Sequence, residues 1–219
     1  MSYGFRQVEM TPVYGFCHHM ICLGYDMFFR GDIYGLDNIP KTGPYLVACN
    51  HASHLDPPFA GMPLPHQLRF FARKTLWHSK FASWWLDAAR VIPVDRDGGS
   101  DVGAIKRVLQ AINENQVIML FPEGTRSETG ELQRPKSGVG MFACRTGAPV
   151  LPARIFGSHK AFGRGGRLRP GTPISVVYGP VLTPADYDDP AQGKNRYQHA
   201  SDVIMSRIAQ LKLPAPPVI

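Results

Sequence analysis

The sequence lacks any uninterrupted apolar run of the roughly 18 residues that a membrane-spanning helix needs. Its beginning, MSYGFRQVEMTPVYGF, also lacks the basic segment followed by an apolar segment that is typical of a secretory signal peptide. We therefore expect a cytoplasmic protein that is neither secreted through a signal peptide nor anchored by a conventional transmembrane helix.

Cysteine is scarce, and the cysteines show neither a C-x-x-C pair nor the spacing of a secreted disulfide scaffold. A reduced compartment is the simpler interpretation. The four cysteines are Cys17, Cys22, Cys49 and Cys144.

Acidic residues are outnumbered, because 24 Lys and Arg residues against 17 Asp and Glu residues leave a formal charge of +7. This excess favours an anionic partner, and composition leaves open phospholipid headgroups, a phosphorylated substrate, coenzyme A and nucleic acid. A solvated basic face explains the charge about as well. The basic residues form no long run, so we expect no nucleic-acid partner. They are spread over several segments, as Arg69, Arg73, Lys74, Arg164, Arg167 and Arg169 illustrate.

Length and composition predict an ordered chain. A share of 44% apolar and 19% charged residues excludes disorder, and 219 residues suffice for one sizeable core. Between Thr11 and Arg30, apolar residues recur at a helical period. We expect residues 1–30 to form an N-terminal amphipathic helical segment and residues 31–219 to form the main domain. The helix can lie in a membrane interface, although a helix packed on the core shows the same period.

After Pro40, short apolar runs alternate with helical stretches. This alternation predicts an α/β fold, a two-layer or three-layer sandwich with a mostly parallel or mixed central sheet. The Gly- and Arg-rich loop 157–173 is expected to be exposed and mobile. The expected strands are Tyr45–Cys49, Leu68–Ala72, Val91–Val94, Val117–Phe121, Val150–Ile155 and Ile174–Tyr178. The expected helices are Phe81–Ala89, Asp101–Asn113, Ser137–Thr146 and Asn195–Leu211.

The segment Asn50–Pro57, which follows the first strong strand, carries the most chemical information. Four residues separate His51 from Asp56. At a strand-to-helix turn, this spacing lets the carboxylate accept a hydrogen bond from Nδ1 and leaves Nε2 free to take a proton. Such a pair supplies a base and its orienting group without a protein nucleophile, so a substrate hydroxyl would attack. Taken alone, this His–Asp pair is weak evidence for catalysis, since many such residues only cap a helix.

Two further segments also lie beyond expected strands. Phe121–Ser127 combines Glu, Gly, Arg and hydroxyl groups, as an anion-binding turn of an α/β domain does. A surface turn capped by Glu123 and Thr125 is the alternative. Arg96 follows the strand that ends at Val94, where its guanidinium can hold a phosphate by two hydrogen bonds.

The blocks N-H-x-x-x-x-D, V-I-P-V-D-R, F-P-E-G-T-R-S and V-L-P-A-R-I occur in this order. With them, the chain from Gly31 to Leu211 resembles the glycerolipid acyltransferase family, which includes 1-acylglycerol-3-phosphate acyltransferases. The resemblance implies that residues 31–219 are an acyltransferase domain. It also implies that the enzyme moves a fatty acyl group from acyl-CoA or acyl carrier protein to a hydroxyl of a lysophospholipid, first of all 1-acylglycerol 3-phosphate.

The resemblance also implies site residues. His51 and Asp56 would be the catalytic pair, with neither a metal nor a cofactor, at the inner face of the membrane. Backbone N–H groups after Asp56 or near Gly124 are expected to stabilise the oxyanion. The expected substrate-binding residues are Arg73, Arg96, Glu123, Gly124, Thr125 and Arg126, and Pro152 belongs to the fourth block.

Arg73 departs from the family pattern, which often has Lys in an A-K-x-x-L stretch where this chain has A-R-K-T-L. Arg keeps the charge but differs from Lys in geometry, so the acceptor can differ from plain lysophosphatidic acid, for example a lyso-aminolipid.

Other interpretations stay open on the residues alone. Cys49 shares a strand face with His51 and can be a nucleophile, although a buried strand cysteine is commoner. His51 and His54 can bind a metal, but a further ligand is lacking. A basic membrane-associated lipid-binding module would use the same Arg-rich surface without turnover. The pairs Trp84–Trp85 and Phe70–Phe71 can line an acyl tunnel or simply fill the core.

Overall fold

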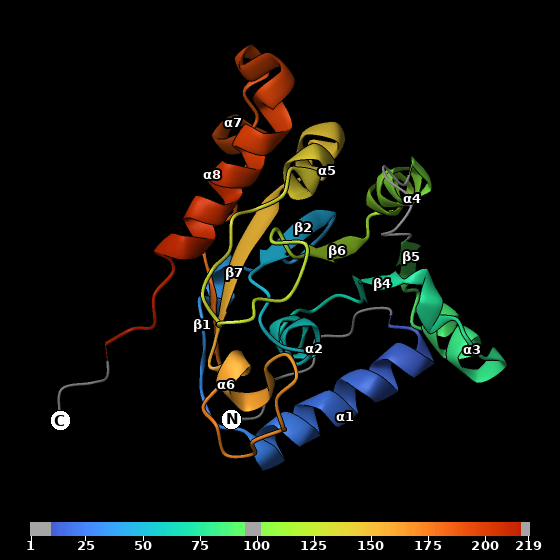
Figure 1. Cartoon of the computed structure of the whole chain (residues 1–219). Helices are drawn as coiled ribbons and strands as arrows, with labels where there is room; N and C mark the ends of the chain where they lie inside the picture. Colours follow the sequence, from blue (N-terminus) through green and yellow to red (C-terminus); the bar gives the residue numbers. More distant parts are fainter. Residues whose placement is uncertain (1–9, 95–101, 216–219) are drawn as a thin grey trace.

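The computed structural model describes residues 10–94 and 102–215 (Figure 1). Its strands are β1 (Ile33–Tyr34), β2 (Tyr45–Cys49), β3 (Leu68–Arg69), β4 (Phe71–Arg73), β5 (Ile92–Val94), β6 (Val117–Leu120), β7 (Val150–Phe156) and β8 (Ser175–Tyr178). Six of them form one sheet in the order β1-β8-β7-β2-β6-β3, and β4 pairs with β5. β7 and β8 are antiparallel, while the other pairs of the sheet are parallel, so the expected mixed sheet is confirmed.

Helices precede, separate and follow the strands along the chain. They are α1 (Pro12–Phe28), α2 (Asp56–Gly61), α3 (Lys80–Ala88), α4 (Val102–Asn113), α5 (Gly138–Thr146), α6 (Ser158–Phe162), α7 (Pro184–Tyr187) and α8 (Arg196–Gln210). α3 begins where the Ser79 hydroxyl accepts the Ala82 N–H at 3.2 Å. α5 ends at Gly147, whose φ of 61° suits glycine.

Two apolar clusters lie on opposite faces of the sheet. Along β2, Val47 and Cys49 belong to one cluster and Leu46 and Ala48 to the other, because successive strand side chains point to opposite faces. The first cluster includes residues of α1 and α2, and the second includes residues of α4, α5 and α8. The fold is therefore a three-layer α/β sandwich, with α5 and α8 on the far side of the sheet from α1 (Figure 1).

The elements expected from periodicity are present, with one difference. The apolar run Leu68–Ala72 divides at Phe70, because β3 joins the large sheet beside β6 while β4 pairs with β5. A single strand was the wrong prediction for this run.

The N-terminal helix is confirmed as α1, and both of its long faces are apolar. Tyr14, Tyr25 and the following Phe29 are buried in the first cluster. The opposite face exposes large apolar side chains, namely Phe16, Met20, Leu23 and Met27. No helix within the described residues is both long and apolar enough to cross a bilayer. The division of the chain at residue 30 stays a prediction.

The loop 157–173 contains more structure than we expected. α6 forms its first third, with Ser158 and Ala161 buried, and the Gly171 N–H donates to the Phe28 carbonyl at 2.6 Å. The arginine-containing stretch 164–170 is exposed, as predicted.

Candidate active site

Three neighbouring strands bring the chemical segments together. β2 pairs in parallel with β6 on one side and β7 on the other, so the turns that follow these strands meet at one edge of the sheet. The side chain of Asn50 ties β2 to β7, since it accepts the Ile155 N–H at 2.8 Å and donates to the Ile155 carbonyl at 3.1 Å. This edge is where the sequence predicted a site.

His51 and Asp56 form the predicted pair. Nδ1 of His51 lies 2.9 Å from Oδ2 of Asp56, which also accepts the N–H groups of Ala52 at 2.6 Å and Ser53 at 2.7 Å. The Asp56 side chain is fully buried, whereas the His51 side chain is 17% exposed. An Nδ1–H that donates to the carboxylate leaves the Nε2 lone pair free to accept a proton.

The turn after β6 holds His51 by three further contacts. The His51 N–H donates to Oε1 of Glu123 at 3.0 Å, and the His51 carbonyl accepts the Ser127 N–H at 2.7 Å. The imidazole stacks on the Phe121 ring, with centroids 4.1 Å apart and planes 22° apart. The two segments that the sequence singled out separately are thus one site.

The structure places the residues of this turn differently with respect to solvent. The Glu123 side chain is buried, and burial raises the pKa of its carboxyl. Thr125 is exposed and Arg126 is half-buried. Burial lowers the pKa of His54, and the positive charge of Arg126 lowers it further, so the two side chains lie close enough to interact electrostatically.

Gly124 has a φ of 69°, which favours glycine. A Cβ at this position would lie 2.9 Å from Cδ and 3.6 Å from Nζ of Lys136, so the lysine stem crosses the turn. The Lys136 N–H donates to the Pro122 carbonyl at 2.9 Å. Sequence reasoning missed Lys136, because no local spacing connects it to the Phe121–Ser127 segment.

Two of the predicted arginines are not placed at the site by the structure. Arg73 lies in β4 in register with Val94 of β5, and its side chain is outside the described part of the structure. Arg96 lies outside the described residues.

One expected oxyanion donor set is wrong. α2 begins Asp56-Pro57-Pro58, and proline has no N–H; the next N–H, of Phe59, already donates to the Leu55 carbonyl. The second expected location stays a prediction; in the described part of the chain, the N–H groups of Thr125 and Arg126 have no protein acceptor. These two groups lie beside Gly124, where the sequence placed the alternative.

Cys49 does not serve the site as a nucleophile. It is fully buried in the first apolar cluster, and burial raises the pKa of its thiol well above the ordinary range. Since the thiolate is the reactive form, the group is an inert core residue. Within the described residues, His, Cys, Asp and Glu side chains gather in no group of three that could hold a metal.

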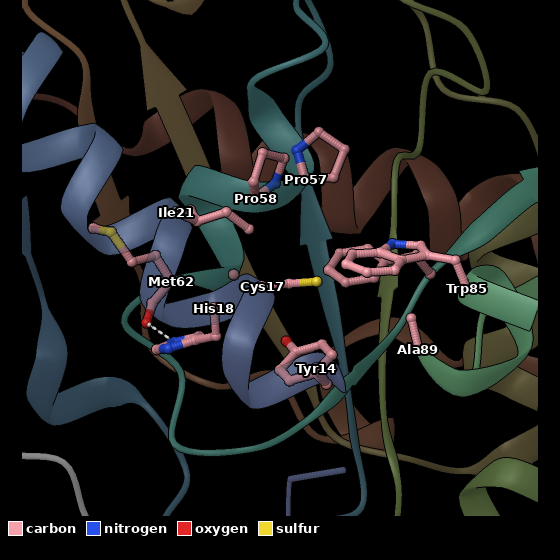
Figure 2. A pocket seen from close by; sticks show the side chains of 11 residues that line it. Tyr14, Cys17, His18, Ile21, Pro57, Pro58, Met62, Trp85 and Ala89 are labelled. Carbon is pink, nitrogen blue, oxygen red and sulfur yellow. Dashed lines mark hydrogen bonds between the residues drawn. The ribbon is translucent and has the colours of Figure 1, made fainter. Parts of the chain in front are cut away.

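An apolar pocket of about 240 Å³ lies between α1, α2 and α3 (Figure 2). Pro57 and Pro58, which directly follow Asp56, form part of its wall, and Figure 2 shows Cys17 pointing across it toward Trp85. Phe70 also lines it, whereas Phe71 stacks on Phe142 in the other cluster. One member of each predicted aromatic pair therefore lines a pocket next to the His–Asp pair.

Comparisons with known proteins agree with this architecture. The Acyltransferase family model matches residues 30–156. The crystal structure of PlsC, the 1-acyl-sn-glycerophosphate acyltransferase of Thermotoga maritima, has the same fold, with a TM-score of 0.75 and 21% identity over 93% of this chain and 81% of that chain. The fold and the site thus define an α/β acyltransferase domain, and the chain belongs to the Acyltransferase family.

Curated relatives carry a more specific name. The 1-acyl-sn-glycerol-3-phosphate acyltransferase of Bacillus subtilis is 26% identical over 91% of this chain and 97% of that protein. The chloroplastic BAT2 of Brassica napus and LPAT1 of Arabidopsis thaliana, with the same enzyme name, are 30% and 29% identical over 70% of this chain. This chain spans 46% and 44% of the length of those two plant proteins.

Proposed function

We propose that this protein transfers a fatty acyl group from an acyl thioester to the free hydroxyl of 1-acylglycerol 3-phosphate, with His51 as general base. The observation that carries the proposal is the geometry of the pair: Asp56 is fully buried and bonded to Nδ1 of a partly exposed His51. The curated relatives and the PlsC structure bear the name of this enzyme.

The reaction follows from this geometry. Nε2 of His51 takes the proton of the acceptor hydroxyl while that oxygen attacks the thioester carbonyl carbon. Asp56 stabilises the imidazolium and keeps the ring in the correct tautomer. The tetrahedral oxyanion accepts hydrogen bonds from the backbone N–H groups of Thr125 and Arg126, which donate to no described protein group. Collapse breaks the carbon–sulfur bond, and the imidazolium returns the proton to the leaving thiolate.

The acceptor phosphate is bound at the turn after β6. Thr125 is exposed and Arg126 is half-buried on this turn, and a hydroxyl and a guanidinium both donate hydrogen bonds to phosphate oxygens. Arg73 and Arg96 stay predicted members of this phosphate site, and a lyso-aminolipid acceptor stays the alternative. The donor is acyl-CoA or acyl carrier protein, and the reaction needs no cofactor.

The acyl chain of the thioester occupies the pocket between α1, α2 and α3. Its wall is mainly apolar, with Ile21, Met62 and Trp85 among its lining residues. Because Pro57 and Pro58 belong both to this wall and to the turn after Asp56, a chain in the pocket has its carbonyl end near His51.

The surface beside the pocket contacts a membrane peripherally, at its inner face. α1 exposes an apolar stripe that includes Phe16 at 62% and Met27 at 64%. α3 adds Phe81 and Trp84, which are 70% and 56% exposed. Aromatic and aliphatic side chains in such a stripe suit the boundary between headgroups and acyl chains.

The test is thiol release from long-chain acyl-CoA with and without lysophosphatidic acid. We expect acceptor-dependent release by the wild type and a loss of at least about 1,000-fold in kcat for His51→Ala, in keeping with the loss of a general base. His199→Ala, on α8, is the matched control and should keep its activity.

Release that ignores both the acceptor and His51→Ala would contradict the mechanism. A wild type without release from acyl-CoA is next tested with acyl carrier protein. Failure with both donors would favour a lipid-binding module without turnover.

A further inference from the structure

Glu123 lies in the segment that the resemblance assigns to head-group binding, yet its carboxylate faces the protein interior. Its side chain is 2% exposed, and Oε1 accepts the N–H of His51 at 3.0 Å. The group therefore contacts the backbone of the proposed base, whereas Thr125 is exposed to solvent and Arg126 partly so.

The charge of Glu123 also opposes a direct role with the acceptor. The acceptor carries a phosphate, and two negative groups at close range in a partly desolvated site repel each other. A buried carboxylate is a poor partner for that phosphate, whereas a backbone N–H is a good one.

Keeping this carboxylate buried costs stability. Within the described part of the chain, Oε2 of Glu123 has only the backbone and side chain of Gln133 near it and forms no hydrogen bond of ordinary geometry. Oδ1 of Asp56 has no hydrogen-bond partner there either. A buried oxygen without a hydrogen bond is rare in folded proteins and calls for an explanation. The two carboxylates share one feature, namely that their other oxygen holds His51.

We propose that Glu123 is a positioning residue that fixes the backbone of His51 through its Oε1 atom; this inference rests on the proposed function of His51. Four contacts hold different parts of His51. Glu123 binds its backbone N–H, and Ser127 binds its backbone carbonyl. Phe121 stacks on the imidazole ring and fixes its plane, and Asp56 binds Nδ1 and fixes the rotation of the ring. Without Glu123 the segment that carries the base can shift, and a small displacement of a base slows the reaction without weakening substrate binding.

The kinetic test compares Glu123→Ala, Glu123→Gln and the control Glu131→Gln, an exposed glutamate in the following loop. We expect Glu123→Ala to lower kcat about 10- to 100-fold, with the KM values for lysophosphatidic acid and the donor unchanged. Glu123→Gln should recover most of kcat, because its amide oxygen accepts the same hydrogen bond. A raised acceptor KM with kcat intact, or a Gln variant as slow as the Ala variant, would overturn the inference.

A second measurement does not depend on turnover. Histidine-selective 15N labelling follows amide hydrogen exchange at His51, with the His51→Ala spectrum as the assignment. Exchange should be faster in Glu123→Ala, restored in Glu123→Gln and unchanged in Glu131→Gln. Unchanged exchange in Glu123→Ala overturns the inference whether or not acyl transfer is seen. Faster exchange in a protein that transfers no acyl group contradicts the proposed function alone.

A third variant covers the case in which Glu123→Ala does not fold. Glu123→Asp keeps the charge but shortens the side chain by one methylene, so its oxygen no longer reaches the His51 N–H. It should reproduce the loss of kcat and the faster exchange. An Asp variant with wild-type kcat and exchange would overturn the inference.

Discussion

At the scale of single residues, some of the groups that hold His51 are its neighbours in the sequence, and others are far from it in the sequence. Asp56 and the N–H groups of Ala52 and Ser53 lie within one short turn, so their arrangement follows from local spacing. The Glu123 contact joins residues 72 positions apart. Local sequence reasoning therefore identifies the pair itself, while the group that fixes its backbone emerges only from the fold.

The buried carboxyl of Glu123 leads to a prediction about how the free energy of unfolding changes with pH. Burial raises its pKa in the folded protein above 4.5, its usual value. Above the unfolded pKa, the unfolded chain loses the proton first, so this group lowers the free energy of unfolding as pH rises through the interval between the two values. Glu123→Gln removes that loss and keeps the acceptor for the His51 N–H.

Urea unfolding of the wild type and Glu123→Gln between pH 4 and pH 7 measures this effect. The Gln variant should gain stability relative to the wild type as pH rises from about 4.5, and the difference should level off above the folded pKa. A difference that stays constant over the whole interval would show that the carboxyl titrates as it does in the unfolded chain.

At the scale of helices and strands, periodicity located the elements well but could not assign partners to them. The run Leu68–Ala72 is apolar throughout, and nothing in it shows that β3 and β4 belong to different sheets. The loop 157–173 was predicted from its Gly and Arg content, so the buried Ser158 and Ala161 of α6 were missed. Short helices packed by tertiary contacts carry too few residues for a clear period.

The packing of α5 on α8 provides a prediction at this scale. A Cβ on Gly140 would lie 2.1 Å from the Tyr197 carbonyl oxygen, whereas a Cβ on Gly138, in the same helix, meets nothing within 4 Å. Gly140→Ala should lower the free energy of unfolding by about 1–3 kcal/mol, because it overpacks the contact. Chemical denaturation of Gly140→Ala and the control Gly138→Ala measures the free energy of unfolding of each variant. Equal losses of stability in the two variants would show that the close approach of α8 to Gly140 is not the cause.

At the scale of the whole molecule, the parallel topology explains why separate blocks form one site. β2 lies between β6 and β7, so the segments after all three meet at one edge, and this much was predicted from the α/β alternation. The sequence named Phe70 and Trp85 as possible acyl-tunnel residues but could not assemble the pocket, because most of its other side chains come from α1 and α2, far from these residues along the chain.

The proposed membrane contact leads to a prediction about the outer face of α1. Phe16 and Met20 are more than half exposed and belong to neither of the two apolar clusters. The double variant Phe16→Ser and Met20→Ser should bind phosphatidylcholine–phosphatidylglycerol vesicles at least about tenfold more weakly, because two apolar side chains no longer enter the interface. Its melting temperature should be unchanged.

Vesicle co-sedimentation measures the binding. Leu213→Ser changes a leucine that is also exposed, beyond the end of α8, and should bind as the wild type does. Equal binding by all three proteins would place the membrane contact elsewhere on the surface.

α1 is apolar on both faces, and this has a kinetic consequence. One face lines the pocket with Cys17 and Ile21 while the other presents Phe16 and Met20 to its surroundings. An enzyme docked on that outer face meets its acceptor by lateral diffusion within a lipid layer. Its rate should then follow the mole fraction of lysophosphatidic acid in the layer, so that adding inert phospholipid slows turnover even when the total amount of acceptor in the sample is constant.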